Sequence, residues 1–347
     1  WNLPALPQPV DGAPEGTTIL ATSRDGSLLA MASAAGVVRV VRSATNELVH
    51  TWKAGENEIQ ALAIHHAPAE VAEEVDPESA PPQPNIQLAA ASADGIVRVF
   101  DGANGEARLA LHGSLAAATS IDFNIDGTKL AAGYSDGALT IWNLGADSFQ
   151  PLADAGTPIT VSATSPDRKL LATDGSSGGR PAVLVRELES GKLLHTLLGH
   201  EGPIAAIAFS PDGKQIASGS ADTTARVWNL GDAKFPEVAR FTGHTDAVTA
   251  VAFHGDAAQV LSGSADASLK LWNVADNQEA VNFAGHKGPV VCVAMVGSQA
   301  ISAAADKTVR FWNAANGQAA RTLTESSAVA ALAISPDGSK LAFGLAD

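Results

Sequence analysis

The chain is poor in several residue types that often signal a function. Its 347 residues include one cysteine, Cys292, one tyrosine, Tyr134, and two methionines. A single cysteine excludes an internal disulfide framework and a zinc site built from several cysteines. No apolar run approaches the roughly 18 residues that a membrane-spanning helix needs, so we expect no membrane insertion.

Basic residues are also scarce. Twenty-two lysines and arginines stand against 37 acids, which gives a formal net charge of −15 at pH 7. A surface of this sign repels phosphate backbones, so we expect no nucleic-acid partner. Charged residues make up 17% of the chain and hydrophobic residues 46%. This composition predicts a folded protein with a large core rather than a disordered chain.

The chain does contain an internal sequence repeat. Four features recur at fixed offsets: a Gly-His pair, a Ser-Pro-Asp-Gly turn, an aspartate, and a Trp-Asn pair six residues after that aspartate. In one well-preserved repeat they are Gly199-His200, the turn at residues 210–213, Asp222 and Trp228-Asn229. Repetition at this spacing must be interpreted before any local motif.

Within one period the pattern is that of β-strands. Residues 204–209, 215–220 and 225–228 are short apolar segments separated by turns rich in glycine, aspartate and proline. This spacing predicts an antiparallel meander of four strands, and no helical periodicity accompanies it. A meander of about 43 residues cannot bury both faces alone, so its copies must stack around an axis.

These motifs resemble the WD-repeat (Trp-Asp repeat) β-propeller family, with Trp-Asn in place of Trp-Asp, in repeats of bacterial type. The resemblance covers essentially the whole chain and is most specific from His200 to Trp312. It weakens in the first repeat, which has Val41 at the tryptophan position. It weakens again in the repeat from Ile159 to Leu188, where that position falls at about Val185. Residues 175–181 replace the second turn of this repeat, and their glycine cluster at residues 175–179 predicts a flexible connection between strands.

The fold we expect is all-β: one closed β-propeller over residues 1–347, built of four-stranded antiparallel blades. The spacing favours eight blades, with seven as the alternative. The expected blades cover about 17–55, 56–113, 114–155, 156–199, 200–243, 244–285 and 286–324, and a last one combines 325–347 with 1–10. Because the chain starts and stops within a repeat, it is expected to be a module of a larger polypeptide. The location stays open: no signal peptide is visible, which favours the cytoplasm, but export is the alternative because the chain starts and stops within a repeat.

Each well-preserved repeat contains a histidine, a serine, an aspartate and a tryptophan, which could be read as a nucleophilic triad. A catalytic set occurs once, however, whereas this one recurs with the blade period. The family resemblance implies a structural tetrad that ties strands together. The expected tetrads are His200, Ser218, Asp222 and Trp228; His244, Ser262, Asp266 and Trp272; and His286, Ser302, Asp306 and Trp312. We therefore expect no catalytic, cofactor-binding or metal-binding residues, no cofactor, and no enzymatic activity.

Of three further features, one recurs with the repeat and two depart from it. Basic residues recur two positions before the aromatic, as at Arg226 and Lys270, and we expect their stems to pack and their charged heads to reach the surface.

Residues 66–84 form an acidic, proline-rich insertion, interpreted as a solubilising loop or as a partner-binding arm. Tyr134 stands where other repeats have serine or alanine; it is a candidate partner contact, or it fills a gap left by small neighbours.

The function that best fits is a non-catalytic scaffold for protein–protein contacts, with partners of unknown identity, acting as a monomeric ring or as part of a larger complex. Two alternatives stay open. One is an accessory propeller of a larger enzyme or sensor. The other is a cofactor-binding propeller with a site in its central channel, which should break the repeat with unique charged residues at the channel mouth.

Overall fold

The computed structural model describes residues 16–67, 85–145, 148–152, 157–231, 237–255, 257–334 and 341–346. Regular secondary structure in these ranges consists of thirty β-strands. None of the described residues belongs to a helix that is long and apolar enough to cross a membrane. The expected all-β architecture is confirmed.

Seven sheets have four antiparallel strands each, arranged in chain order across the sheet. The first three sheets are β1 (Thr17–Thr22), β2 (Leu28–Ser33), β3 (Val37–Arg42), β4 (Leu48–Lys53); β5 (Ile59–Ala67), β6 (Asn85–Ser92), β7 (Ile96–Asp101), β8 (Ala107–His112); and β9 (Ala118–Phe123), β10 (Lys129–Tyr134), β11 (Leu139–Asn143), β12 (Ser148–Leu152). The fourth and fifth are β13 (Ser162–Thr164), β14 (Leu170–Ser177), β15 (Arg180–Glu187), β16 (Leu193–Leu198); and β17 (Ile204–Phe209), β18 (Gln215–Ser220), β19 (Ala225–Asn229), β20 (Glu237–Phe241). The sixth and seventh are β21 (Val248–Phe253), β22 (Gln259–Ser264), β23 (Leu269–Asn273), β24 (Glu279–Phe283); and β25 (Val290–Val296), β26 (Gln299–Ala304), β27 (Thr308–Asn313), β28 (Ala319–Thr324).

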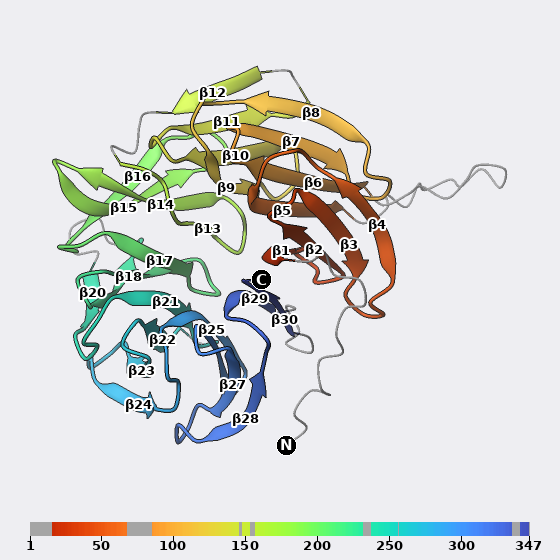
Figure 1. Cartoon of the computed structure of the whole chain (residues 1–347). Coiled ribbons are helices and arrows are strands. Elements are labelled where there is room, and N and C mark those ends of the chain that lie inside the picture. Colours follow the sequence, from red (N-terminus) through yellow and green to blue (C-terminus); the bar gives the residue numbers. More distant parts are fainter. Residues whose placement is uncertain are drawn as a thin grey trace, which may run out of the picture.

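An eighth sheet has two described strands, β29 (Val329–Ile334) and β30 (Leu341–Leu345). It touches both the seventh and the first sheet. Phe343 packs in one cluster with Ile301 and Val309, whereas Ala342 packs with Leu29 and Met31. Figure 1 shows the sheets following one another around a common centre, with β29 near β1.

The turn between β17 and β18 shows why the chain reverses at its Ser-Pro-Asp-Gly segments. Ser210 Oγ donates to Asp212 Oδ1 at 2.6 Å and accepts from the N–H of Gln215 at 2.9 Å. Gly213 has a φ of +70°, a left-handed conformation that glycine adopts without steric cost. The turn sets the register in which Phe209 of β17 lies opposite Ile216 of β18.

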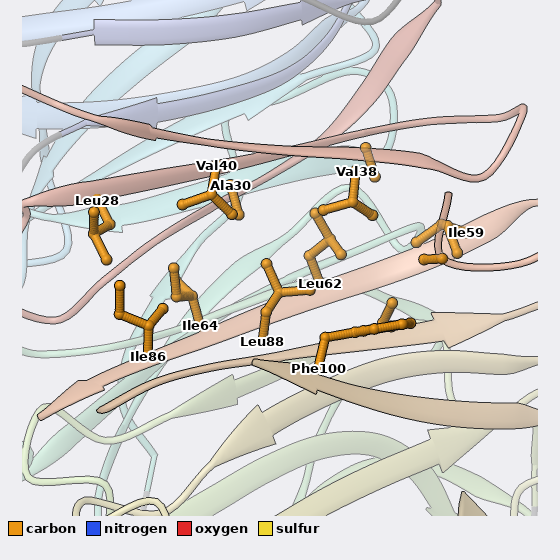
Figure 2. Packing of buried hydrophobic residues seen from close by; sticks show 13 residues of the cluster. Leu28, Ala30, Val38, Val40, Ile59, Leu62, Ile64, Ile86, Leu88 and Phe100 are labelled. Carbon is orange, nitrogen blue, oxygen red and sulfur yellow. The ribbon is translucent and has the colours of Figure 1, made fainter. Parts of the chain in front are cut away.

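The core lies between neighbouring sheets. The first and second sheets share one cluster, shown in Figure 2, that includes Leu28, Ala30, Val38, Val40, Ile59, Leu62, Ile64, Ile86, Leu88 and Phe100. Burial of each large apolar side chain contributes about 1.5–3 kcal/mol. Because each sheet packs against the next, a single meander could not supply this core by itself.

The glycine-rich residues 175–181 are an ordered hairpin, so the expected flexible connection is wrong. β14 and β15 are eight residues long each and continue in register to Ser177 opposite Arg180. Gly178 and Gly179 have φ values of +59° and +75°, which suit a tight two-residue hairpin turn. A methyl group at either glycine would meet nothing within 4 Å, so the turn projects from the sheet.

The same hairpin corrects the tryptophan-equivalent position of the fourth sheet. Leu171 lies opposite Arg186, as Ile216 lies opposite Trp228, so Arg186 and not Val185 occupies that position. Arg186 is buried, and burial lowers its pKa. Its guanidinium donates to the carbonyl oxygen of Gly191 at 3.4 Å.

Some expectations fall on parts of the chain that the structure does not describe. Of the acidic insertion, His66 and Ala67 belong to β5, and residues 68–84 lie outside the described residues. Residues 1–15 and 335–340 also lie outside them, and so do Trp1 and the Ser-Pro-Asp-Gly turn at residues 335–338.

Candidate functional site

The recurrent polar residues of the fifth sheet form one hydrogen-bonded chain. His200 Nδ1 lies 2.9 Å from Asp222 Oδ2, and His200 Nε2 lies 2.8 Å from Ser218 Oγ. The indole N–H of Trp228 donates to the same Ser218 Oγ at 2.8 Å. The histidine comes from the loop before β17, the serine from β18 and the tryptophan from β19, so the chain of bonds ties successive strands of one sheet together.

The sixth and seventh sheets repeat this geometry. The histidine–aspartate, histidine–serine and tryptophan–serine distances are 3.0, 2.8 and 2.8 Å for His244, Asp266, Ser262 and Trp272. They are 3.0, 2.7 and 2.8 Å for His286, Asp306, Ser302 and Trp312. The structure thus brings together all twelve residues that the sequence singles out as tetrads.

The electrostatics give each tetrad one direction of hydrogen bonding. Burial lowers the pKa of His200 against the opposing effect of Asp222, so the imidazole is neutral at pH 7. Its Nδ1–H then donates to Asp222, and its Nε2 accepts the hydroxyl proton of Ser218, whose oxygen accepts from Trp228. Although burial raises the pKa of Asp222, hydrogen bonds from Thr224, the N–H of Glu201 and His200 hold it well below its ordinary value.

The tetrads are fully engaged within the protein. Ser218, Ser262 and Ser302 are each 0% exposed, so none can meet a substrate in this conformation. Each buried polar group left unpaired would cost about 1–3 kcal/mol, which makes the tetrads a substantial stabilising element. Their geometry suits blade cohesion and not nucleophilic catalysis.

The basic residues two positions before the aromatic behave differently from expectation in two repeats. The Arg226 guanidinium is buried, with its side chain 3% exposed, and pairs with Glu237 at 2.6 Å. Lys270 pairs with Glu279 at 2.5 Å and lies 5.8 Å from the centre of the Trp272 ring. The expectation that these heads reach the surface is wrong here, because a glutamate on the outer strand offers each of them a partner beside the tetrad.

The third sheet keeps the aspartate and the tryptophan of the tetrad, Asp136 and Trp142, but has Ser114 and Ala132 in place of the histidine and the serine, and Tyr134 fills space beside them. Tyr134 is 0% exposed and packs with Ala118 and Trp142. The candidate partner contact at Tyr134 is therefore corrected: a side chain with no exposed surface cannot contact a partner. The alternative interpretation, that it fills a gap left by small residues, agrees with its packing.

Comparison with the fifth sheet gives the physical reason. A methyl group at Gly199 would come 2.4 Å from the Arg226 guanidinium, whereas one at Gly113 would come 2.4 Å from the Tyr134 hydroxyl. The third sheet has Thr140 where the fifth has Arg226. Tyr134 thus occupies the volume that the arginine head takes elsewhere. Burial raises the pKa of Tyr134 far above its ordinary value, and the hydroxyl has no hydrogen-bond partner of normal geometry.

A surface residue that the sequence reasoning missed is Leu115. It is 101% exposed, the highest value among the exposed large hydrophobic residues in the described part of the chain. It lies two residues after Gly113, where the corresponding loops have polar residues: Asn57, Glu201, Thr245 and Lys287. Aligning the repeats position by position would have shown this exchange of polar for apolar character.

Leu115 lies on the face of the molecule that carries the Gly-His loops and the aspartate turns, here called the aspartate-turn face. On one side of it, Ser114 Oγ donates to Asp136 at 2.5 Å. On the other, the turn of Asp94 comes so close that a methyl group at Gly95 would lie 2.8 Å from the carbonyl oxygen of Ser114. The loop is therefore held between two aspartate turns while its leucine points into solvent.

The opposite face, which carries the Ser-Pro-Asp-Gly turns, has polar pairs that do not repeat. His66 Nδ1 lies 3.0 Å from Asp25 Oδ2, and Arg168 lies 3.2 Å from Asp122 Oδ1. Both pairs join neighbouring sheets. Among the described residues, no three histidine, cysteine, aspartate or glutamate side chains are grouped so that they could hold a metal ion. Cys292 is a free thiol in β25, and burial raises its pKa.

Comparison with known proteins agrees with this architecture. A family model described as "WD domain, G-beta repeat" matches residues 106–143, 191–229, 235–273 and 277–313. The crystal structure of the computationally designed Ika8 protein superposes with a TM-score of 0.75 over 96% of this chain and 98% of that one. At 24% identity, this likeness shows a shared fold.

Two natural relatives are similar over part of their length. Transcription initiation factor TFIID subunit 5 of Drosophila melanogaster is 31% identical over 114 residues, which is 32% of this chain and 14% of that protein. Serine-threonine kinase receptor-associated protein of Dictyostelium discoideum is 35% identical over 112 residues, 32% of this chain and 36% of that protein. The chain thus spans well under half of either relative. The matched segments show that the chain contains WD repeats, and its sheets and the superposition show a β-propeller-like all-β repeat protein.

Proposed function

We propose that this chain is a non-catalytic scaffold that binds another protein on its aspartate-turn face. WD40 proteins generally bind other proteins. One relative is named as a subunit of a transcription initiation factor and the other as associated with a kinase receptor. We further propose that the chain acts as one module of a larger polypeptide, as the matched segment does within the Drosophila subunit.

The observation that carries this proposal is the exposure of Leu115. Single leucines on a surface are ordinary, but this one is completely exposed and replaces polar residues of the corresponding loops. Its burial by a partner would contribute about 1.5–3 kcal/mol. Hydrogen bonds and close backbone packing hold its loop, so little conformational entropy would be lost on binding.

The charge distribution supports a basic partner. Residues 54–167 contain 16 acids and three bases, a net charge of −13 out of the −15 of the whole chain. Leu115 belongs to this stretch, and the exposed residues Glu56, Glu58 and Asp136 lie on the same face. An apolar side chain flanked by lysine or arginine would complement Leu115 and its surroundings.

We also propose a closed ring of eight blades, in which residues 1–10 complete the eighth sheet beside β30. Contacts of β29 and β30 with the seventh and first sheets support eight blades over seven. The blades would follow the expected boundaries from residue 17 onward, and one domain would cover residues 1–347.

Photo-crosslinking tests the scaffold proposal. A photoreactive amino acid is placed at position 115 and, as a matched control, at position 48, because Leu48 is also an exposed leucine, on β4. After irradiation in an extract of the native cells, we expect a distinct protein adduct from position 115 that position 48 does not give. An excess of the chain without the photoreactive residue should compete for the partner and suppress this adduct, whereas the same excess of Leu115→Ser should not. The same adducts from both positions, or none from position 115, would contradict the proposal.

A further inference from the structure

The outer strand of each four-stranded sheet has one edge without a neighbouring strand in its sheet. An unpaired edge exposes backbone N–H and C=O groups that another chain can pair with, and proteins usually protect such edges with charged residues or proline. Six of the seven outer strands carry such a residue: Lys53 in β4, Arg108 in β8, Pro151 in β12, Glu237 in β20, Glu279 in β24 and Arg321 in β28.

β16 is the exception. Its sequence, Leu-Leu-His-Thr-Leu-Leu, contains neither a charged residue nor a proline. Its histidine, His195, adds no charge at neutral pH, because burial lowers its pKa. β16 is the last strand of its sheet, and Figure 1 shows the sheet running outward from β13 to β16. One outer edge of the molecule is therefore left without the usual protection.

The side chains of this strand add apolar surface to the open edge. Leu193, Leu194 and Leu198 are 42%, 40% and 42% exposed. A bulge at Leu194 interrupts the pairing with β15, and beyond it His195, Thr196, Leu197 and Leu198 follow a regular register. This four-residue stretch is the part of the edge that is geometrically ready for another strand.

The pattern of β16 is self-complementary about Thr196. In a symmetric antiparallel pair, one residue lies opposite its own copy, and residues at equal distance on either side lie opposite each other. With Thr196 at the centre, His195 of one copy lies opposite Leu197 of the other, twice, and Leu198 comes beside the bulge at Leu194 of the other copy. Lys192 before the strand also comes near Glu201 after the partner's strand, and both are exposed and of opposite charge.

We propose that a second copy of this chain pairs with β16, so that two rings associate edge to edge through an antiparallel β16–β16 contact about Thr196. The interface is small, so the dimer is weak and depends on concentration. This surface is distinct from Leu115, so the proposal does not depend on the scaffold function and can fail separately from it.

The register of the repeats supplies a test variant that the fold should accommodate. Leu198 lies opposite Ala182, four residues before Arg186, and Lys53 lies opposite Val37, four residues before Val41. Val41 and Arg186 both take the tryptophan-equivalent position. Leu198→Lys therefore introduces into β16 the residue that β4 has at the same place. Leu48→Lys is the matched control, because Leu48 corresponds to Leu193 and is equally exposed.

Sedimentation equilibrium of the full chain from 5 to 500 µM is the experiment, in ~0.15 M salt to screen the overall charge repulsion. We expect a monomer–dimer equilibrium in the parent and in Leu48→Lys, and a dissociation constant at least tenfold higher in Leu198→Lys. As a second variant, Lys192→Glu should weaken the dimer, and adding Glu201→Lys should restore it. A monomer at all concentrations, or a dimer that Leu198→Lys does not weaken, would overturn the proposal. Unchanged crosslinking from position 115 in Leu198→Lys would show that the scaffold function stands apart.

Discussion

The hydroxyl of Tyr134 lies directly over the backbone of Gly113, where a methyl group would come within 2.4 Å of it. In the fifth sheet the guanidinium of Arg226 takes the equivalent place over Gly199. The two repeats thus fill the same volume with different chemistry. The arginine brings an ion pair, whereas the tyrosine brings a ring whose hydroxyl has no hydrogen-bond partner of normal geometry.

This packing predicts how Tyr134 variants behave. Tyr134→Ala should lower the free energy of unfolding by about 3–5 kcal/mol, because it leaves a cavity in the cluster. Tyr134→Phe should be close to neutral or slightly stabilising, because the hydroxyl has no hydrogen-bond partner of normal geometry to lose. Urea denaturation measures both. A Tyr134→Phe variant as unstable as Tyr134→Ala would show that the hydroxyl makes a bond that this geometry lacks.

The tetrads predict a difference between two tryptophans. Trp272→Phe should cost about 1–3 kcal/mol, because Ser262 loses the indole donor. Trp52→Phe is the control: the Trp52 side chain is half-buried, and its indole nitrogen has no hydrogen-bond partner. It should cost less. Equal denaturation midpoints for the two variants would show that the loss of the indole–Ser262 hydrogen bond does not cause the destabilisation of Trp272→Phe.

The buried histidines predict a loss of stability in acid. Burial lowers the pKa values of His200, His244 and His286 from the ordinary 6.5 in the folded protein. The unfolded chain therefore binds protons that the folded chain does not, and stability present above pH 6.5 is lost as the pH falls below it. Below the ordinary 3.8, the depressed carboxylates add a second loss, which for Asp306 continues to a pKa of about 2.

Thermal melting between pH 7.5 and pH 5 checks this dependence at constant ionic strength. The melting temperature should fall with pH, and His244→Gln should melt lower at pH 7.5 but show a shallower slope. A melting temperature that does not change over this range would contradict neutral histidines in the tetrads.

Replacement of the acidic insertion should leave the fold intact. Ala67 and Asn85 lie directly opposite each other at the ends of β5 and β6, so Asn-Gly in place of residues 68–84 can close the hairpin with a two-residue turn. We expect nearly the same melting temperature, because long surface insertions cost little closure entropy. A drop of roughly ten degrees would mean that the insertion contributes several kcal/mol to stability. If a captured partner is lost at unchanged stability, the insertion is a binding arm.

Deletion of residues 1–10 tests the proposed eighth blade. If this segment pairs with β30, its removal should lower the melting temperature by roughly 5–10 °C, and a synthetic peptide of residues 1–10 should restore it. Deletion of residues 11–15 instead, with the first ten kept, controls for shortening alone. An unchanged melting temperature after the first deletion would favour the seven-bladed alternative.

Particular residues show which features of the structure a repeated sequence can predict. The twelve tetrad residues are identifiable because a hydrogen-bonded chain of this length requires four residue types at set distances, and three repeats satisfy that requirement. Val185 fails as a tryptophan equivalent because the β14–β15 hairpin continues to a glycine turn, and a count of residues cannot show where a hairpin reverses. Arg226 and Lys270 are buried because outer-strand glutamates meet them, a contact between strands that spacing alone does not specify.

The sequence by itself determined the all-β class, the four-stranded meanders and the tetrads, because each depends on short-range periodicity and on turns whose residues are adjacent in the chain. Only the tertiary structure decided the burial of Tyr134, the exposure of Leu115 and the open edge at β16. Each of these depends on the volume and the hydrogen-bonding groups that neighbouring strands and sheets present to one side chain, and those neighbours are distant in sequence. A repeat defines what its positions share, whereas function at a single position depends on how one copy departs from the others in its own packed surroundings.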